Sequence, residues 1–115
     1  MKVKTSELEG AALDWAVAKA ASVDVYANPH WGPVTKDGCS PYRPSTDWSQ
    51  GGPLIDRYLI EFRTQAKGCK VLAWAAHEPR PSEGPSHLVA ACRAVVKIEI
   101  GDTIDVPDEL MEGER

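Results

Sequence analysis

The chain has 115 residues, of which 43% are hydrophobic and 26% are charged, and its formal net charge is −4. That length suits one globular domain with its own core, which we expect over residues 1–107, with a loose acidic tail over residues 108–115. The acidic balance argues against binding to a nucleic-acid polymer, and no apolar run is long enough to span a membrane.

The first predicted element is a helix that begins near a capping box, in which Ser6 is followed three residues later by Glu9. This helix should run to about Ala20. Apolar residues at helical spacing place Trp15 on the buried stripe, whereas Asp14 falls on the opposite side. We therefore expect Trp15 in the core, packed with the other long helix of the chain.

A short strand is expected over residues 23–26, where apolar and polar residues alternate, and Asn28 with the following proline ends it. Residues 29–44 are rich in Gly, Pro, Ser and aromatic residues. This composition predicts a long loop, and loops of that length in a compact domain are often functional.

The following segment, residues 42–55, holds the densest set of special-purpose side chains in the chain. An aromatic residue and an arginine come first, then three side chains that carry oxygen, a tryptophan, a glutamine and two glycines. The candidate ligand-binding residues are Tyr42, Arg43, Ser45, Thr46, Asp47, Trp48, Gln50, Gly51 and Gly52.

Asp47 followed by Gln50 indicates a capping box at a helix start, although Ser45 or Thr46 is an alternative cap. Amide groups at such a start favour anions, and the two glycines allow a ligand or another backbone to approach closely. Pro53 is tolerated in the first turn of a helix, so we expect one short turn, a kink and a second turn.

Two strands are predicted next, over residues 58–63 and 70–76, because apolar and polar residues alternate there. A turn at residues 66–68 should join them as an antiparallel pair. Residues 78–84 contain prolines and charges and are expected to form an exposed loop.

The last helix is expected to open at Pro85 and to stop at Gly101. Its buried stripe should include Leu88, Cys92 and Val95. A further short strand is expected around residues 104–106. The element order predicts the α+β class: one small antiparallel sheet packed on one face by two long helices, with a long functional loop and a short central helix.

Motifs for catalysis, cofactors or metals are missing from the sequence. It has no phosphate-binding loop, no nucleophile elbow and no paired Cys or His at zinc-ligand spacing, so we expect neither an enzyme nor a cofactor. An odd number of widely spaced cysteines suits a reducing cytosol. The residues concerned are His30, His77, His87, Cys39, Cys69 and Cys92.

Four blocks of the sequence resemble one family. The most specific is residues 45–55, and the others are residues 1–5 with 12–18, residues 90–96, and residues 101–102 with 106–107. Together they are similar to the NinX-like family of small phage and prophage proteins. The resemblance implies a phage-borne accessory protein of the host bacterial cytoplasm, and it supplies no catalytic residues.

Two functions remain open. The first is a non-enzymatic binding module that holds a small anionic ligand, for example a nucleotide-like one, at residues 42–52 and so sequesters a host defence signal. There Arg43 would bind the charge, and Tyr42 or Trp48 would stack on the ligand. The alternative is a protein-interaction module that inhibits a host enzyme through its surface, with residues 45–52 serving the fold. In either case we expect a homo-oligomer, because a small sheet leaves exposed edges and apolar patches.

Overall fold

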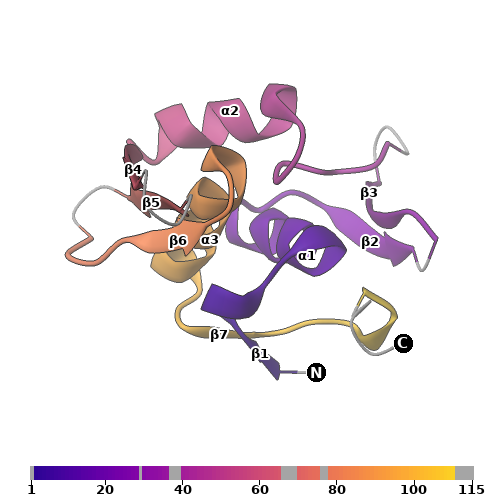
Figure 1. Cartoon of the computed structure of the whole chain (residues 1–115). Coiled ribbons are helices and arrows are strands. Elements are labelled where there is room, and N and C mark those ends of the chain that lie inside the picture. Colours follow the sequence, from indigo (N-terminus) through magenta and orange to yellow (C-terminus); the bar gives the residue numbers. More distant parts are fainter. Residues whose placement is uncertain (1, 29, 37–39, 66–69, 76–77, 111–115) are drawn as a thin grey trace.

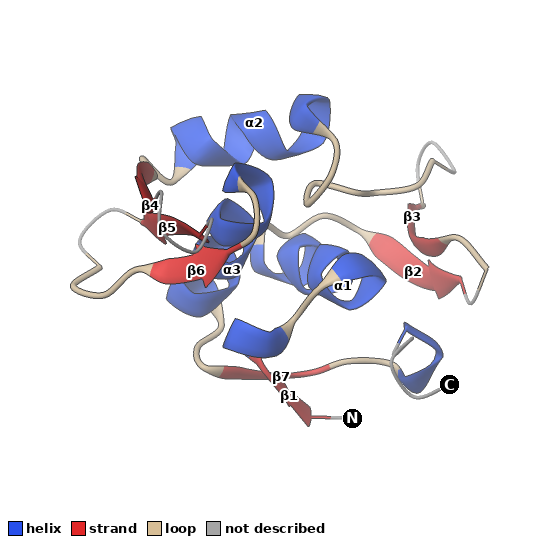
Figure 2. Cartoon of the chain, viewed as in Figure 1, coloured by secondary structure: helices blue, strands red, loops and turns tan. Residues whose placement is uncertain are grey.

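The computed structural model describes residues 2–28, 30–36, 40–65, 70–75 and 78–110, and these combine helices with short strands (Figures 1 and 2). Its helices are α1 (Gly10–Ala20), α2 (Trp48–Arg57) and α3 (His87–Glu99). Two 3-10 turns, at Thr5–Glu7 and Asp108–Leu110, lie near the two ends of the described chain.

Within the described residues, the strands form three separate antiparallel sheets. β1 (Lys2–Lys4) pairs with β7 (Thr103–Asp105), and β2 (Val25–Asn28) pairs with β3 (Gly32–Thr35). The third sheet has the order β4 (Glu61–Gln65), β5 (Lys70–Trp74) and β6 (Ser82–Gly84). The α+β class is therefore confirmed, but three small sheets replace the single sheet that we expected.

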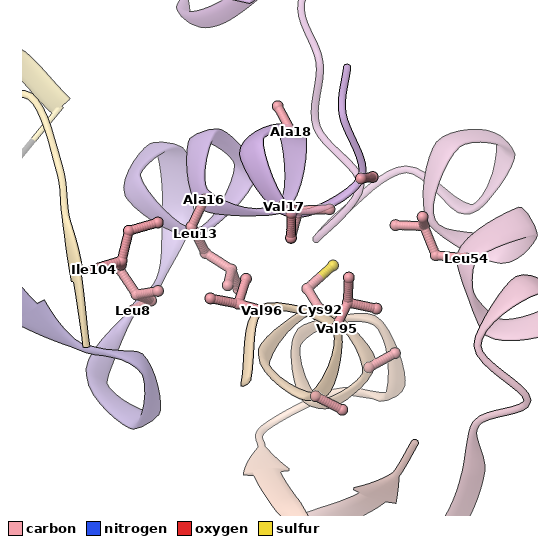
Figure 3. Close-up of a cluster of buried hydrophobic side chains, with 14 of the residues drawn as sticks. Leu8, Leu13, Ala16, Val17, Ala18, Leu54, Cys92, Val95, Val96 and Ile104 are labelled. Atoms are coloured by element: carbon pink, nitrogen blue, oxygen red, sulfur yellow. The ribbon is translucent and has the colours of Figure 1, made fainter. Parts of the chain in front are cut away.

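The core of the molecule is the contact between α1 and α3. Leu13 and Val17 of α1 face Cys92, Val95 and Val96 of α3, and all five are buried (Figure 3). α3 also lies against β5 and β6, while α1 lies against β2 and β3. The two long helices thus pack on each other, and each covers a different sheet. Their apolar sides are therefore buried without one large sheet beneath both helices. The expected burial of the α3 stripe is confirmed.

The start of α1 differs from the prediction. The helix begins at Gly10, whose φ of +58° is a left-handed conformation that glycine adopts easily. Its N-cap residue is Glu9, which makes no side-chain capping hydrogen bond. Ser6 lies in the preceding 3-10 turn, so the expected capping box of Ser6 and Glu9 is wrong. The expected end at Ala20 is confirmed.

For two neighbouring residues of α1, the burial that periodicity predicted is reversed. Asp14 is only 4% exposed, whereas Trp15 is half-buried at the edge of the core, with the Lys19 ammonium 5.2 Å from the centroid of its ring. The reason is that the segment before α2 covers a second side of α1, where the Asp14 carboxylate accepts a hydrogen bond from the Ser45 amide. The sequence of α1 alone does not reveal that second contact.

The first strands also lie elsewhere than predicted. The expected strand at residues 23–26 is displaced to β2, and β3 lies inside the stretch that we expected to be a loop. β3 includes Gly32 and Pro33, which are typical of loops. Pro33 donates no hydrogen bond, but its carbonyl accepts one of 2.9 Å from the Tyr42 amide, so the returning chain covers this edge.

α2 is one continuous helix through Pro53, and the expected kink and second segment are not seen. The helix runs on to Arg57, with Tyr58 as its C-cap, so residues 58–60 belong to the helix end and β4 begins only at Glu61. β4 and β5 are antiparallel as predicted. The turn expected at residues 66–68 lies outside the described residues.

The last part of the chain follows the prediction more closely. α3 begins two residues later than expected, after Ser86, whose hydroxyl accepts a 3.2 Å hydrogen bond from the Val89 amide. Gly101, with a φ of +121°, follows its C-cap, and β7 is the expected short strand. β6 lies within the expected loop at residues 78–84, where it pairs with β5. Leu110 is 2% exposed, and residues 111–115 are outside the description.

Candidate functional site

The central segment, residues 42–55, leads from the chain after β3 into α2 and lies above the pair of long helices in Figure 1. Its first residue, Tyr42, is buried, and burial raises the pKa of its hydroxyl to about 12, with smaller contributions from Cys92 and Asp14. A ring enclosed in this way offers no open face on which a ligand can stack. Within the central segment, exposed aromatic surface comes instead from Trp48, which is 58% exposed.

Ser45 connects the central segment to α1. Its amide donates a 2.9 Å hydrogen bond to Asp14 Oδ1, and both residues are buried. Burial raises the pKa of Asp14 to about 6, although the Ser45 hydroxyl and amide and the Arg43 charge each act to lower it. The hydroxyl faces the carboxylate without a hydrogen bond of good geometry. This buried carboxylate therefore anchors the backbone at Ser45.

The start of α2 is capped by Asp47, as predicted. The Asp47 carboxylate accepts hydrogen bonds from the Ser49 amide at 2.9 Å and the Ser49 hydroxyl at 2.7 Å, and these bonds lower its pKa. The reciprocal half of the capping box is absent, because the Asp47 amide donates to the Arg43 carbonyl at 2.8 Å. Thr46 and Arg43 are both exposed beside this start.

Gln50 holds the chain that leads into α2, instead of completing the cap. Its Oε1 accepts a 2.6 Å hydrogen bond from the Arg43 amide, and its Nε2 donates to the Pro41 carbonyl at 3.2 Å. One side chain thereby fixes both sides of Tyr42. These contacts occupy the amide group of Gln50, so its polar atoms serve the fold.

The two glycines of α2 have different surroundings. A Cβ at Gly51 would overlap the Pro44 carbonyl oxygen and lie 2.7 Å from Leu88 Cδ2. A Cβ at Gly52 would meet nothing within 4 Å. Gly51 therefore allows α2 to pack closely on the preceding segment and on α3, whereas Gly52 leaves an open place on the outer side of α2.

That outer side carries a row of apolar residues. Trp48, Ile55 and Leu59 follow one another at helical spacing, with Gly52 between the first two. Leu59 is 67% exposed, and it has a φ of +52°, which is uncommon for leucine. These residues line a shallow pocket of about 600 Å³ together with Asp56 and Glu61. We call the surface formed by Trp48, Gly52, Ile55 and Leu59 the Trp48 face.

A second pocket, of about 350 Å³, continues the Trp48 face over β4 and β5. It shares Leu59 and Glu61 with the first pocket and adds Phe62, Arg63 and Glu78. Acidic groups therefore border the apolar surface along both pockets. Ile55 and Leu59 were not among the predicted site residues, which ended at Gly52. Leu59 was assigned to the strand predicted over residues 58–63, and continuing the helical spacing from Trp48 would have found both residues.

Metal-binding side chains do not gather in the part of the chain that the structure describes, where no three His, Cys, Asp or Glu residues could hold an ion together. The Cys92 thiol is buried, and burial raises its pKa well above the usual range. The His87 ring contacts the edge of Phe62, at 5.0 Å between centroids. Cys39, Cys69 and His77 lie outside the described residues. In the helices described, none is long and apolar enough to cross a membrane.

A sequence model described as "Bacteriophage P22, NinX" matches residues 4–98. The chain belongs to this NinX family. The resemblance inferred from the sequence blocks is thus confirmed, and the matched NinX region includes the central segment and the whole Trp48 face. β7 lies beyond the match. No curated protein matches the chain.

Proposed function

We propose that this NinX-family chain is a protein-interaction module that docks a partner protein on the Trp48 face. One observation carries the proposal: two large apolar side chains, Trp48 at the start of α2 and Leu59 just after its end, are mostly exposed and line one shallow pocket. Exposed apolar clusters bordered by polar groups are typical of interaction sites, and tryptophan is enriched among the residues that dominate binding. The left-handed backbone of Leu59 supports the same assignment, because local strain is often retained for function.

The charges around the Trp48 face favour a basic partner. Asp56, Glu61 and Glu78 line its two pockets, against one cation, Arg63. A partner with an apolar ridge flanked by lysines or arginines would complement this arrangement, for example an amphipathic helix. A second copy of the chain would bring like charges together. In a phage accessory protein of the host cytoplasm, such docking would inhibit a host enzyme.

Contacts within the central segment support the protein-interaction alternative over ligand binding at residues 42–52. Tyr42 and Ser45 are buried, and Gly51 is packed against Pro44 and Leu88. Gln50 uses its amide group on neighbouring backbone. These residues are accounted for by the fold. A small anionic ligand at Arg43 stays a prediction, which the anion titrations described below test.

A designed peptide pair tests the docking proposal. The probe is a synthetic helical peptide with leucines on one side and lysines on the other, and its twin carries glutamates in place of the lysines. Calorimetry should show binding of the basic peptide only, weakening as salt rises because screening reduces the attraction. Trp48→Ala and Leu59→Ala should each weaken binding by about tenfold or more.

Trp31→Ala is the matched control, since Trp31 is 54% exposed between β2 and β3 and lines neither pocket of the Trp48 face. It should leave peptide binding unchanged. Equal loss in the Trp31 and Trp48 variants, or equal binding of both peptides, contradicts the proposal. The expected homo-oligomer is measured in parallel by light scattering. Pairing through the Trp48 face would strengthen with salt, which is the opposite of the response to the basic peptide.

A further inference from the structure

A separate pocket lies on the other side of α3, bounded by β1, β6 and the chain that enters β7. Its volume is about 710 Å³, within the range of small-molecule sites. None of its lining residues belongs to the Trp48 face or to the central segment. It is therefore independent of the proposed protein-docking function.

The lining of this pocket is basic, whereas the whole chain is acidic. Four cationic side chains, Lys4, Lys70, Arg93 and Lys97, face two acidic ones, although the whole chain has a net charge of −4. Lys70 is paired with the carboxylate of Glu83 at 3.4 Å. Lys4 and Lys97 have no salt-bridge partner among the described residues, so two ammonium groups remain available to an anion.

Arg93 is held in a fixed position at this pocket. Its Nε donates a 2.9 Å hydrogen bond to the Leu8 carbonyl, and one terminal nitrogen donates a 2.7 Å hydrogen bond to the Glu83 carbonyl. The two hydrogen-bond acceptors are neutral carbonyls, and the carboxylates of Glu9 and Glu83 also act on the guanidinium charge. A positioned guanidinium beside mobile ammonium groups is a common arrangement for binding phosphate.

We propose that this pocket, which we call the basic pocket, binds a small phosphate-bearing molecule of about nucleotide size. Lys4 and Lys97 supply the contacts to phosphate oxygens. Arg93 adds a positive charge that the fold holds in one position beside them. The cations come from three separate elements around one cavity, so a compact anion contacts them together. A nucleic-acid polymer would also meet the acidic remainder of the surface, and a compact ligand avoids that repulsion.

The test is calorimetric titration of the intact chain with pyrophosphate and with ATP, and adenosine serves as the uncharged probe. Pyrophosphate and ATP should bind, and adenosine should not. Lys97→Ala and Lys4→Ala should each weaken ATP binding by about tenfold or more, the loss expected for a hydrogen bond to a charged group. These variants are preferred to Arg93→Ala, which also removes hydrogen bonds to two carbonyls of the fold.

Lys36→Ala is the charge-matched control, because Lys36 forms an exposed pair with Asp24 outside the basic pocket. It should leave ATP binding within about twofold of the parent chain. Three results would overturn the proposal: no binding of either phosphate probe, equal weakening by Lys36→Ala and Lys97→Ala, or weakening by Arg43→Ala alone. The last result would place the anion at the central segment instead.

Discussion

At the residue scale, Gly51 shows how a single missing side chain sets the position of a helix. Because it has no Cβ, α2 can approach Pro44 and Leu88 closely, and this contact connects α2 to the core. The neighbouring Gly52 makes no comparable contact, so the packing of α2 does not require a glycine at that position. Two adjacent glycines in one helix therefore allow a direct comparison of crowded and open surroundings.

Gly51→Ala should destabilise the chain by about 1–3 kcal/mol, because the added methyl group would force apart closely packed atoms. Gly52→Ala should stabilise it by about 0.5–1 kcal/mol, since alanine loses less backbone freedom than glycine when a helix forms. Urea denaturation of both variants measures the two free energies of unfolding. Equal effects would show that α2 does not pack on Pro44 and Leu88 as described.

At the element scale, α2 depends on the residues just before it. Asp47 satisfies the Ser49 amide at the helix start, and Gln50 holds the backbone of Pro41 and Arg43. The helix then continues past Pro53 and presents the Trp48 face. The composition of the central segment is thus explained mainly by how a helix is started and held.

Asp47→Ala should lower Tm by several degrees, because an amide at the helix start loses its acceptor. Asp47→Asn is the control, since asparagine caps helices about as well as aspartate and should keep Tm close to that of the parent. Thermal melts followed by circular dichroism measure both. If the Asn variant melts as early as the Ala variant, the carboxylate charge matters more than the hydrogen bond.

The sequence predicts the elements that depend on local signals and misplaces those that depend on distant ones. The α3 stripe, the Asp47 cap and the stop at Gly101 follow from neighbours within a few residues, and each was predicted correctly. β3 was missed because its Gly and Pro are stabilised by pairing with β2 and by the returning Tyr42 amide.

The candidate site shows the same division. Trp48 was identified, but Leu59, which lines the same pocket, was not, because alternation in residues 58–63 is equally compatible with a strand. The basic pocket joins Lys4, Lys70 and Lys97, which are far apart in the sequence. Only the folded chain brings such residues together, so spacing could not predict it.

At the scale of the whole molecule, Asp14 joins α1 to the segment before α2 and makes stability depend on pH. Its pKa is raised by burial to about 6, from an ordinary value near 3.8. The folded chain therefore keeps a proton there that the unfolded chain releases between these values. The stabilising contribution is complete below about pH 4 and is lost as the pH rises through about 6.

Asp14→Asn should remove this dependence, because asparagine keeps an oxygen for the Ser45 amide but does not titrate. Between pH 4 and 7, the free energy of unfolding of the parent chain should fall by about 2–3 kcal/mol relative to that of the variant. This difference corresponds to a pKa shift of roughly two units. Urea denaturation at several pH values measures the difference. Parallel curves for the two proteins would mean that Asp14 is not buried as described.

The pairing of β1 with β7 has a consequence for how the chain is made. Lys2 lies opposite Asp105, and the Thr5 amide and hydroxyl bind the Asp102 and Gly101 carbonyls. β1 therefore emerges from the ribosome early, and its partner strand emerges only after α3 has been translated. A nascent chain that stalls before Thr103 exposes the unpaired edge of β1, and such an edge can recruit another chain. Pairing of β1 with β7 therefore has to wait until the chain has been translated beyond α3.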